Sequence, residues 1–279
     1  MPGMAFDLAR YTRACAPVDD GDIDYGAFAE RPLSPAALRT LRYMCDIESH
    51  TVCYLRDMLV TPSHRDPEIT TFMTMWNYEE FWHGEVLAKV LAAHGVPTGA
   101  AHVRAVRSGA GWRDRLAPVA QSVAGNVLGD DFIAVHMAWG AVNEWSTHAG
   151  YPRLIEREDH PVLTTLLVRI ARQETRHIAF YATQARTRLA ASARARRLTR
   201  FALARFWQPV GSGVMPSAET RHLLRHLFGG VEGAALVAPL DERIDGLPGL
   251  AGLGLVRAAA RRWRLDAGPA RPGPVLAPA

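Results

Sequence analysis

The segment from Trp76 to Gly95 carries two ionisable side chains on a helix face that should be buried. Its sequence, WNYEEFWHGEVLAKVLAAHG, has the periodicity of an amphipathic helix. Glu80 and His83 share one face of that helix, because residues three and four apart lie on the same side. Burying a carboxylate beside an imidazole is costly unless a partner compensates the charge. The pair therefore belongs either to a salt bridge in a core or to a metal site. The rest of the face is apolar and consists of Met73, Trp76, Leu87, Val90 and Leu91.

Helix start signals recur along the chain, and no segment alternates in the manner of a strand. Ser34-Pro35, Asp66-Pro67 and His160-Pro161 each place a capping residue before a proline in the first helical turn. We expect four long helices, over residues 34–60, 66–94, 130–149 and 160–191, and a further helix over 113–127. This pattern predicts an all-α fold whose central unit is a bundle of four long helices.

The domain organisation follows from where the helical pattern is strong. Residues 1–33 are expected to be irregular apart from one short helix, and residues 34–190 to form the bundle. Residues 191–265 are expected to add two or three shorter helices packed on the bundle. Residues 266–279, rich in proline and alanine, are expected to form a flexible tail.

Composition narrows the class of protein. No apolar run approaches the length of a membrane span, and the N-terminal residues lack the apolar core of a secretory signal. The three cysteines, Cys15, Cys45 and Cys53, contain no C-x-x-C pair, which favours free thiols in a reducing compartment. A cytoplasmic protein is predicted. The net charge of +4 is modest and no nucleic-acid-binding motif accompanies it, so nucleic acid is not an expected partner.

Arginine is concentrated after the fourth predicted helix. The stretch from Arg186 to Arg205 holds arginines and no acidic residue. Such a stripe is either a solvated helix face or a docking surface for an acidic partner protein. The residues proposed for docking are Arg194, Arg196, Arg197 and Arg200.

Four glutamates and two histidines recur in a fixed order on the four predicted helices. The order is a lone Glu, then Glu-x-x-His, then a lone Glu, then Glu-x-x-His, with nearly equal spacing in the two halves. A third Glu-x-x-His, Glu219 to His222, lacks an upstream glutamate and is expected at the surface. The six residues of the repeat are Glu48, Glu80, His83, Glu144, Glu174 and His177.

The residue types of this repeat indicate a two-metal site. Four carboxylates neutralise the charge of two divalent ions and can bridge both, and such sites form in the cores of helix bundles. Imidazole and carboxylate ligands together suit iron, with manganese as the alternative. A set of buried Glu–His and Glu–Arg ion pairs is the competing interpretation.

Three segments resemble the soluble acyl-[acyl-carrier-protein] desaturases. WNYEEFWHG is similar to the pattern W-x-x-E-E-x-x-H-G of that family's second metal helix, and NEWSTHAGYPRL is similar to its third. HPVLTTLLVRIARQETRHIAFYA is similar to its fourth, D-P-V-L followed by D-E-x-R-H-x-x-x-Y. The resemblance covers residues 39–189 and implies a ferritin-like four-helix bundle that holds two iron ions. The matching residues are Trp76, Glu79, Glu80, His83, Gly84, Glu144, Thr147, Glu174, Arg176, His177 and Tyr181.

The resemblance implies an O2-dependent non-haem di-iron oxidase that desaturates a fatty acyl chain on a carrier, with electrons from a ferredoxin-like donor. Thr147 would help to deliver a proton, and Trp76 would either lie on an electron route or pack. Gln173 stands where the family has an aspartate, and Trp82 where it has an arginine. Gln173 can accept a hydrogen bond from a ligand histidine but supplies no charge. Trp76, Gln173 and Arg176 are the residues expected beside the ligands.

A desaturase needs an apolar slot beside its metals that excludes water. Gly140 and Ala141 lie one turn before Glu144, where small residues are expected to leave room for a substrate. A di-iron hydroxylase or N-oxygenase of a specialised pathway, and a ferritin-type ferroxidase, remain as alternatives, and a homodimer is left open. The residues expected to line the slot are Met44, Met137, Gly140, Ala141 and Tyr181.

Overall fold

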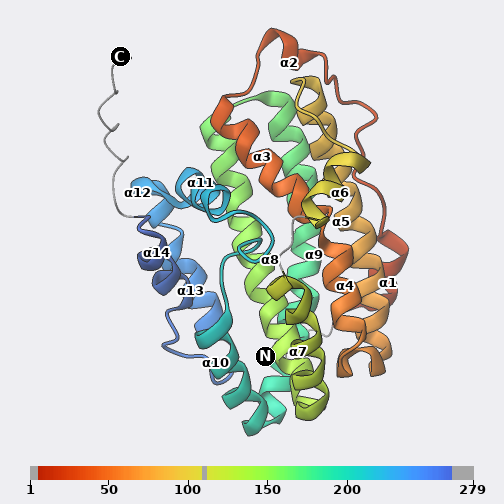
Figure 1. Ribbon diagram of the computed structural model, residues 1–279, viewed down its shortest axis with the longest axis vertical. Coiled ribbons are helices and arrows are strands. Elements are labelled where there is room, and N and C mark those ends of the chain that lie inside the picture. Colours follow the sequence, from red (N-terminus) through yellow and green to blue (C-terminus); the bar gives the residue numbers. More distant parts are fainter. Residues whose placement is uncertain (1–5, 109–111, 266–279) are drawn as a thin grey trace.

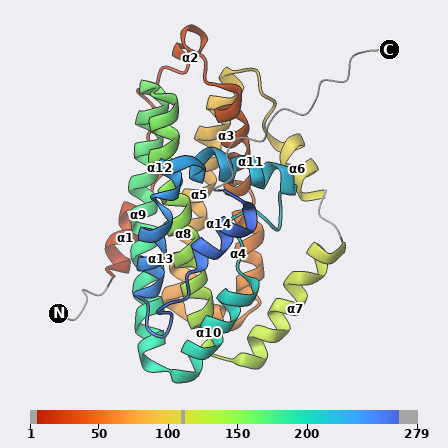
Figure 2. The same ribbon diagram turned by 90° about the vertical axis from the view of Figure 1, so that its left-hand side faces the viewer.

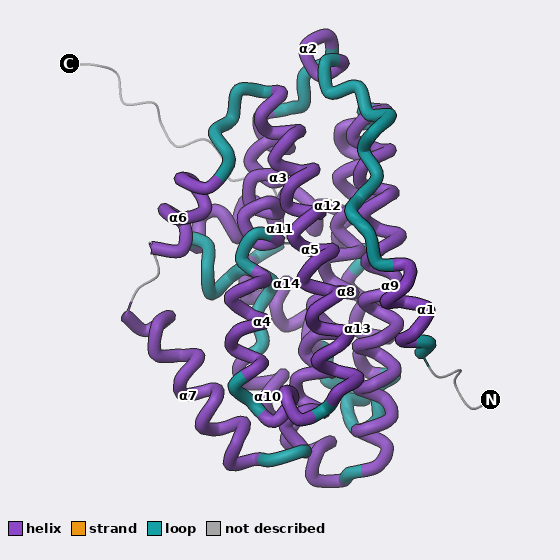
Figure 3. Tube along the Cα trace, turned by 90° about the vertical axis from the view of Figure 1, so that its right-hand side faces the viewer, coloured by secondary structure: helices purple, strands orange, loops and turns teal. Residues whose placement is uncertain are grey.

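The computed structural model describes residues 6–108 and 112–265, and no strand occurs in these two stretches. Helices, drawn in purple, make up most of the trace in Figure 3. The all-α prediction is therefore confirmed. The predicted tail, residues 266–279, lies outside the described residues.

Five helices form the centre of the molecule and run along one another (Figure 1). α3 and α4 both pack on α5, α5 packs on α9, and α9 pairs with α8. Their inward residues, such as Leu41, Met73, Leu87, Met137 and Leu167, are fully buried. These central helices are α3 (Pro35–Glu48), α4 (Thr51–Leu59), α5 (Pro67–Ala93), α8 (Asp131–Glu158) and α9 (Pro161–Ala191).

Shorter helices surround the central ones. α10, α11 and α13 pack against α8, and Figure 2 shows α10 to α14 on that side of the molecule. The C-terminal region therefore has five helices, not the two or three expected, and the first 33 residues include two. The bounds are α1 (Leu8–Ala14), α2 (Ala27–Glu30), the 3₁₀ helix η1 (Pro62–Arg65), α6 (Ala100–Ser108), α7 (Trp112–Leu128), α10 (Ala193–Phe206), α11 (Ser217–Phe228), α12 (Gly230–Ala234), α13 (Val237–Asp245) and α14 (Leu255–Trp263).

The predicted helix starts are formed by side-chain caps. Ser34 accepts a hydrogen bond from the N–H of Ala37, Asp66 accepts from two N–H groups, and His160 accepts from Leu163. In each case the capping residue precedes a proline that needs no hydrogen bond for its nitrogen. Gly95 follows the end of α5 with a φ of 69°, a backbone conformation that glycine adopts at little cost.

The first predicted helix is broken in the structure. α3 ends at Glu48 and α4 begins at Thr51, whose hydroxyl donates to the carbonyl of Glu48 at 2.7 Å. That local bond competes with helix continuation. The break also changes the helix register, so Val52, four residues after Glu48, is 44% exposed. The prediction of one helix from Ser34 to Val60 was wrong.

The third predicted helix continues beyond its expected end. α8 passes Pro152 and stops only at Glu158, followed by Asp159 in the left-handed conformation with a φ of 46°. A proline inside a helix removes a backbone hydrogen bond. Burial of Tyr151 and Leu154, both fully shielded from solvent, offsets that loss, because large apolar side chains dominate helix stability in a core.

Within these two described stretches, no single helix has the length and apolar composition needed to cross a membrane. Ser217–Phe228 and Gly230–Asp245 meet that criterion only as a pair, with a bend of 94° between them.

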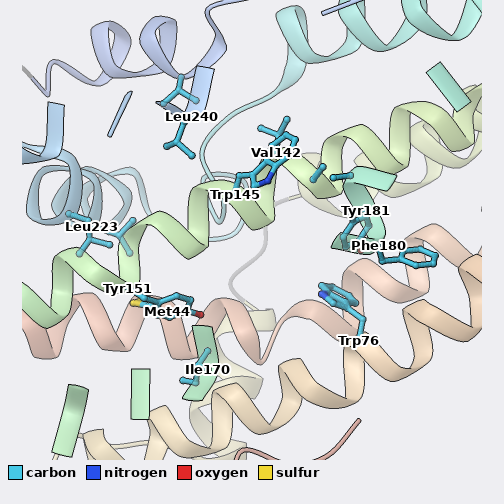
Figure 4. Packing of buried hydrophobic residues seen from close by; sticks show 14 of the residues in the cluster. Met44, Trp76, Val142, Trp145, Tyr151, Ile170, Phe180, Tyr181, Leu223 and Leu240 are labelled. Carbon is cyan, nitrogen blue, oxygen red and sulfur yellow. The ribbon is translucent and has the colours of Figure 1, made fainter. Parts of the chain in front are cut away.

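The space expected beside Gly140 is filled by an aromatic ring. A Cβ atom at Gly140 would lie 2.2 Å from Cε1 of Tyr181, far inside contact distance. Tyr181, Phe180 and Trp76 lie together in the core (Figure 4). In this structure the glycine therefore lets α8 approach the Tyr181 ring and leaves no room there for a substrate.

This contact predicts the effect of adding one methyl group. Gly140→Ala should lower the free energy of unfolding by about 1–3 kcal/mol, the usual range for overpacking a core. Chemical denaturation of the metal-free protein measures the change. Gly213→Ala is the matched control, since no atom lies near its Cβ position. In the background Tyr181→Ala, Gly140→Ala should cost nothing further, and an unchanged cost there would contradict the contact.

Candidate metal centre

The six residues of the sequence repeat converge inside the central helices. Glu48 is the last residue of α3, and Glu80 and His83 lie in the middle of α5. Glu144 comes from α8, and Glu174 and His177 come from α9. None of the six is more than 7% exposed. Helices that are separate in sequence thus bring four carboxylates and two imidazoles together without solvent.

The ligand atoms fall into two overlapping groups, each within 4.8 Å of one another. Two carboxylates, Glu80 and Glu174, belong to both groups and are placed to bridge two ions. Each group adds one glutamate and one histidine of its own. Position A consists of Glu48, Glu80, His83 and Glu174, and position B consists of Glu80, Glu144, Glu174 and His177.

Both imidazoles turn the same nitrogen toward the bridging carboxylates. Nδ1 of His177 lies 3.1 Å from Glu80 and 3.1 Å from Glu174. Nδ1 of His83 lies 3.3 Å from Glu174 and 3.7 Å from Glu80. The remaining nitrogen of each ring, Nε2, points outward and is free to make an orienting hydrogen bond.

Two buried polar atoms in this cluster are available to a metal ion. Oε1 of Glu80 and Nδ1 of His83 have no hydrogen-bond partner among the described residues. Buried polar atoms are nearly always satisfied in native proteins. A divalent ion at position A would satisfy both, and the mixed oxygen and nitrogen donor set suits iron or manganese.

The charges of the cluster are strongly coupled. Burial raises the pKa of Glu48 and of Glu144 well above the usual range, and the neighbouring carboxylates add to the effect. Burial alone would also raise the pKa of Glu174, but the adjacent imidazoles of His177 and His83 hold it well below the usual range. Burial would lower the pKa of His177, but hydrogen bonds with the surrounding carboxylates raise it well above the ordinary value. The metal-free cluster therefore retains protons that cations would replace.

The outer nitrogens of the two histidines have different partners. Nε2 of His177 lies 2.8 Å from a carboxylate oxygen of Glu79, and Nε2 of His83 lies 2.8 Å from the side-chain oxygen of Gln173. Arg176 pairs with Glu79 at 2.5 Å. Gln173 thus contacts one of the two histidines directly, whereas Arg176 contacts the carboxylate behind the other. Glu79 belongs to the sequence resemblance described above, but no role was predicted for it. Its position directly before Glu80, like that of Gln173 directly before Glu174, was the available signal.

Two aromatic residues donate hydrogen bonds to the ligand carboxylates. Nε1 of Trp76 donates to Glu144 at 3.0 Å, so the indole orients a ligand in addition to packing. The hydroxyl of Tyr151 donates to Glu174 at 3.1 Å and lies 3.4 Å from Glu48. Sequence analysis did not assign Tyr151 to the site. Its position two helical turns after Glu144, on the same face of α8, was the available indication.

Thr147 and the slot residues are placed differently from the ligands. Thr147 is half-buried one turn after Glu144, and no hydrogen bond joins it to the six residues in the described part of the chain. Met44, Met137, Ala141 and Tyr181 are buried in the closed core around the site. A cavity of about 40 Å³ lies between α8 and the C-terminal helices, and none of the six ligands lines it.

The arginine stripe is only partly available to a partner. Arg196 donates to the carbonyls at the end of α9, and Arg200 donates to the carbonyls of Gly249 and Ala251. These bonds join elements of the fold and use one guanidinium nitrogen of each arginine, and Arg200 remains exposed. The docking surface stays a prediction. Arg194 is mostly exposed beside Asp131, and Arg197 is exposed.

The geometry predicts a metal stoichiometry. The protein should bind close to two iron or manganese ions per chain, and Glu144→Ala should lose most of one, because position B loses its own carboxylate. Elemental analysis after loading and desalting measures this. Glu219→Ala is the control, since Glu219 lies at the surface in an ion pair with Arg39 at 2.7 Å. Equal losses from the two variants would contradict the ligand assignment.

The retained protons predict a pH dependence. Glu48, Glu144 and His177 have a raised pKa in the folded metal-free protein, so they hold protons at pH values where free side chains do not. A metal must displace these protons, and its affinity should therefore rise with pH. Calorimetric titration with Mn²⁺ in two buffers of different ionisation enthalpy should report net proton release. Affinity that is independent of pH would show that the carboxylates are already ionised.

Comparison of the chain with protein-family models, with curated proteins and with solved structures finds no match.

Proposed function

We propose that this chain is an O2-dependent oxidase with a non-haem di-iron centre in a ferritin-like four-helix bundle. The observation that carries the proposal is the sharing of Glu80 and Glu174 between two four-residue groups, each with its own glutamate and histidine. Glu80 and Glu174 would hold two ions close together, and with Glu48 and Glu144 they would neutralise the four positive charges. When bound, a pair of irons supplies oxidation by dioxygen with electrons from an external donor.

The chain's own residues prepare the site for such chemistry. Trp76 and Tyr151 hold the carboxylates of Glu144 and Glu174 in place through hydrogen bonds. The hydroxyl of Tyr151, fully buried, is also a proton donor within the cluster. Apolar side chains such as Phe72 and Met73 surround the ligands and exclude water, which strengthens every electrostatic interaction inside.

The proposed reaction is desaturation of an acyl chain on a carrier protein. The resemblance of the ligand segments to the desaturases supports it, and the exposed Arg194 and Arg197 suit an acidic carrier or a ferredoxin-like donor. In this proposal the Tyr181 ring must leave Gly140 before a long chain can lie beside the metals, because the ring fills that space.

A ferroxidase is the second candidate. The closed packing around Gly140 favours it, because oxidation of ferrous ions needs no room for an organic substrate. In that case the centre would turn over ferrous iron itself.

Oxygen uptake distinguishes the two candidates. The iron-loaded protein, supplied with reductant, a ferredoxin and acyl carriers of several chain lengths, should consume oxygen and yield an acyl product that lacks two hydrogens. Mass spectrometry of the acyl group measures the product. Glu144→Ala should lose the activity and Glu219→Ala should keep it. Oxygen uptake that follows only added ferrous iron, without an acyl product, would establish the ferroxidase instead.

A further inference from the structure

The groups behind the two ligand histidines differ in charge. A carboxylate, Glu79, stands behind His177, and an amide, Gln173, stands behind His83, both at 2.8 Å. A hydrogen bond from imidazole to an acceptor fixes the ring and raises its basicity as a metal ligand. An ionised acceptor does this more strongly than a neutral one, because charge-assisted hydrogen bonds are stronger.

The carboxylate of Glu79 is held by three side chains. It lies 2.8 Å from Nε2 of His177 and 2.5 Å from Arg176. The hydroxyl of Tyr11 donates at 2.9 Å. Arg176 offsets part of the charge of Glu79, yet its side chain is 33% exposed whereas Glu79 is fully buried. Solvent therefore screens the arginine more than the carboxylate.

A hydrogen bond to the N-terminal segment fixes the orientation of the neutral Gln173 amide. Its side-chain nitrogen donates to the carbonyl of Ala16 at 3.0 Å, which leaves its oxygen directed at His83. The amide can orient the ring but contributes no charge. The carbonyl of Ala16 also disfavours a carboxylate in that place, since two acceptors would face each other.

The carboxylates that belong to one position only are also held unequally. Glu144 of position B accepts the indole N–H of Trp76 at 3.0 Å. Glu48 of position A has the hydroxyl of Tyr151 at 3.4 Å, and that hydroxyl lies closer to Glu174, at 3.1 Å. Glu144, the better oriented glutamate, and His177, whose outer nitrogen faces a carboxylate, thus both belong to position B.

We infer that the two positions are unequal: position B binds a divalent ion more tightly and fills first, and Glu79 and Gln173 set the difference as positioning residues. This inference rests on the proposed two-metal site. It also gives the N-terminal segment a role, because Tyr11 and the carbonyl of Ala16 fix the two groups that differ.

The experiment is an anaerobic titration of the metal-free protein with Co²⁺, followed by calorimetry and visible absorption. The unmodified protein should bind two ions in two resolved steps. His83→Ala should keep the tight step and His177→Ala should lose it, which assigns the steps to positions. The opposite pattern would overturn the inference.

Glu79→Gln tests the cause, because it gives both histidines a neutral amide. The tight step should weaken by about 10- to 100-fold, the usual effect of losing such an outer partner, and approach the weak step. Tyr11→Phe should weaken the same step less, and Glu219→Gln should change neither. Circular dichroism and thermal unfolding of the metal-free variants show whether they fold.

The outcomes separate this inference from the proposal on which it rests. Two ions bound with equal affinity, or an equal effect of Glu79→Gln on both steps, would overturn the inequality and leave the two-metal site intact. Binding of fewer than two ions by the unmodified protein would overturn the two-metal site itself.

Discussion

Four carboxylates buried around two imidazoles are the constraint on which the rest of the structure depends. Two imidazolium ions can balance at most two of the negative charges, and an uncompensated buried charge is strongly destabilising. The metal-free protein meets this by keeping protons on Glu48 and Glu144, whose pKa values burial raises. Two divalent ions would balance all four carboxylates at once. In the proposed two-metal site, bound ions would therefore supply the positive charge that the polypeptide lacks.

The same constraint explains the layers of hydrogen bonds around the ligands. A carboxylate or imidazole that must hold a metal needs a fixed orientation, and every ring or carboxylate left free costs entropy on binding. Trp76, Tyr151, Glu79 and Gln173 each fix one or more ligands. Glu79 and Gln173 are in turn held by the N-terminal segment. That segment, although largely irregular, therefore contacts the groups next to the candidate ligands through Tyr11 and Ala16.

The local sequence was sufficient to predict helix starts and the inward faces of helices. Proline after a capping residue marked the starts of α3, α5 and α9, and helical periodicity placed all six glutamates and histidines on inward faces. The features that were missed depend on contacts between distant residues. The Thr51 hydroxyl bonds to the carbonyl of Glu48 where the first predicted helix breaks. α8 continues beyond Pro152 because Tyr151 and Leu154 are buried. Glu79 of α5 lies 2.8 Å from His177 of α9. The prediction that Gly140 leaves room for a substrate failed for the same reason. A small residue in the sequence does not reveal whether a substrate or another side chain, here Tyr181, occupies the adjacent space.

The contact between Gly140 and Tyr181 also decides how a closed core could serve a long apolar substrate. The ring is held mainly by packing, because among the described residues its hydroxyl donates only to the sulfur of Met73, at 3.2 Å, and a thioether is a weak acceptor. An acyl chain that took the place of the ring would exchange one apolar contact with α8 for another. The exchange would sacrifice a weak hydrogen bond and would leave the strong bonds around Glu144 and Glu174 untouched. In the desaturase proposal the displaced ring would need another apolar position, because it also packs against Phe72 and Trp76.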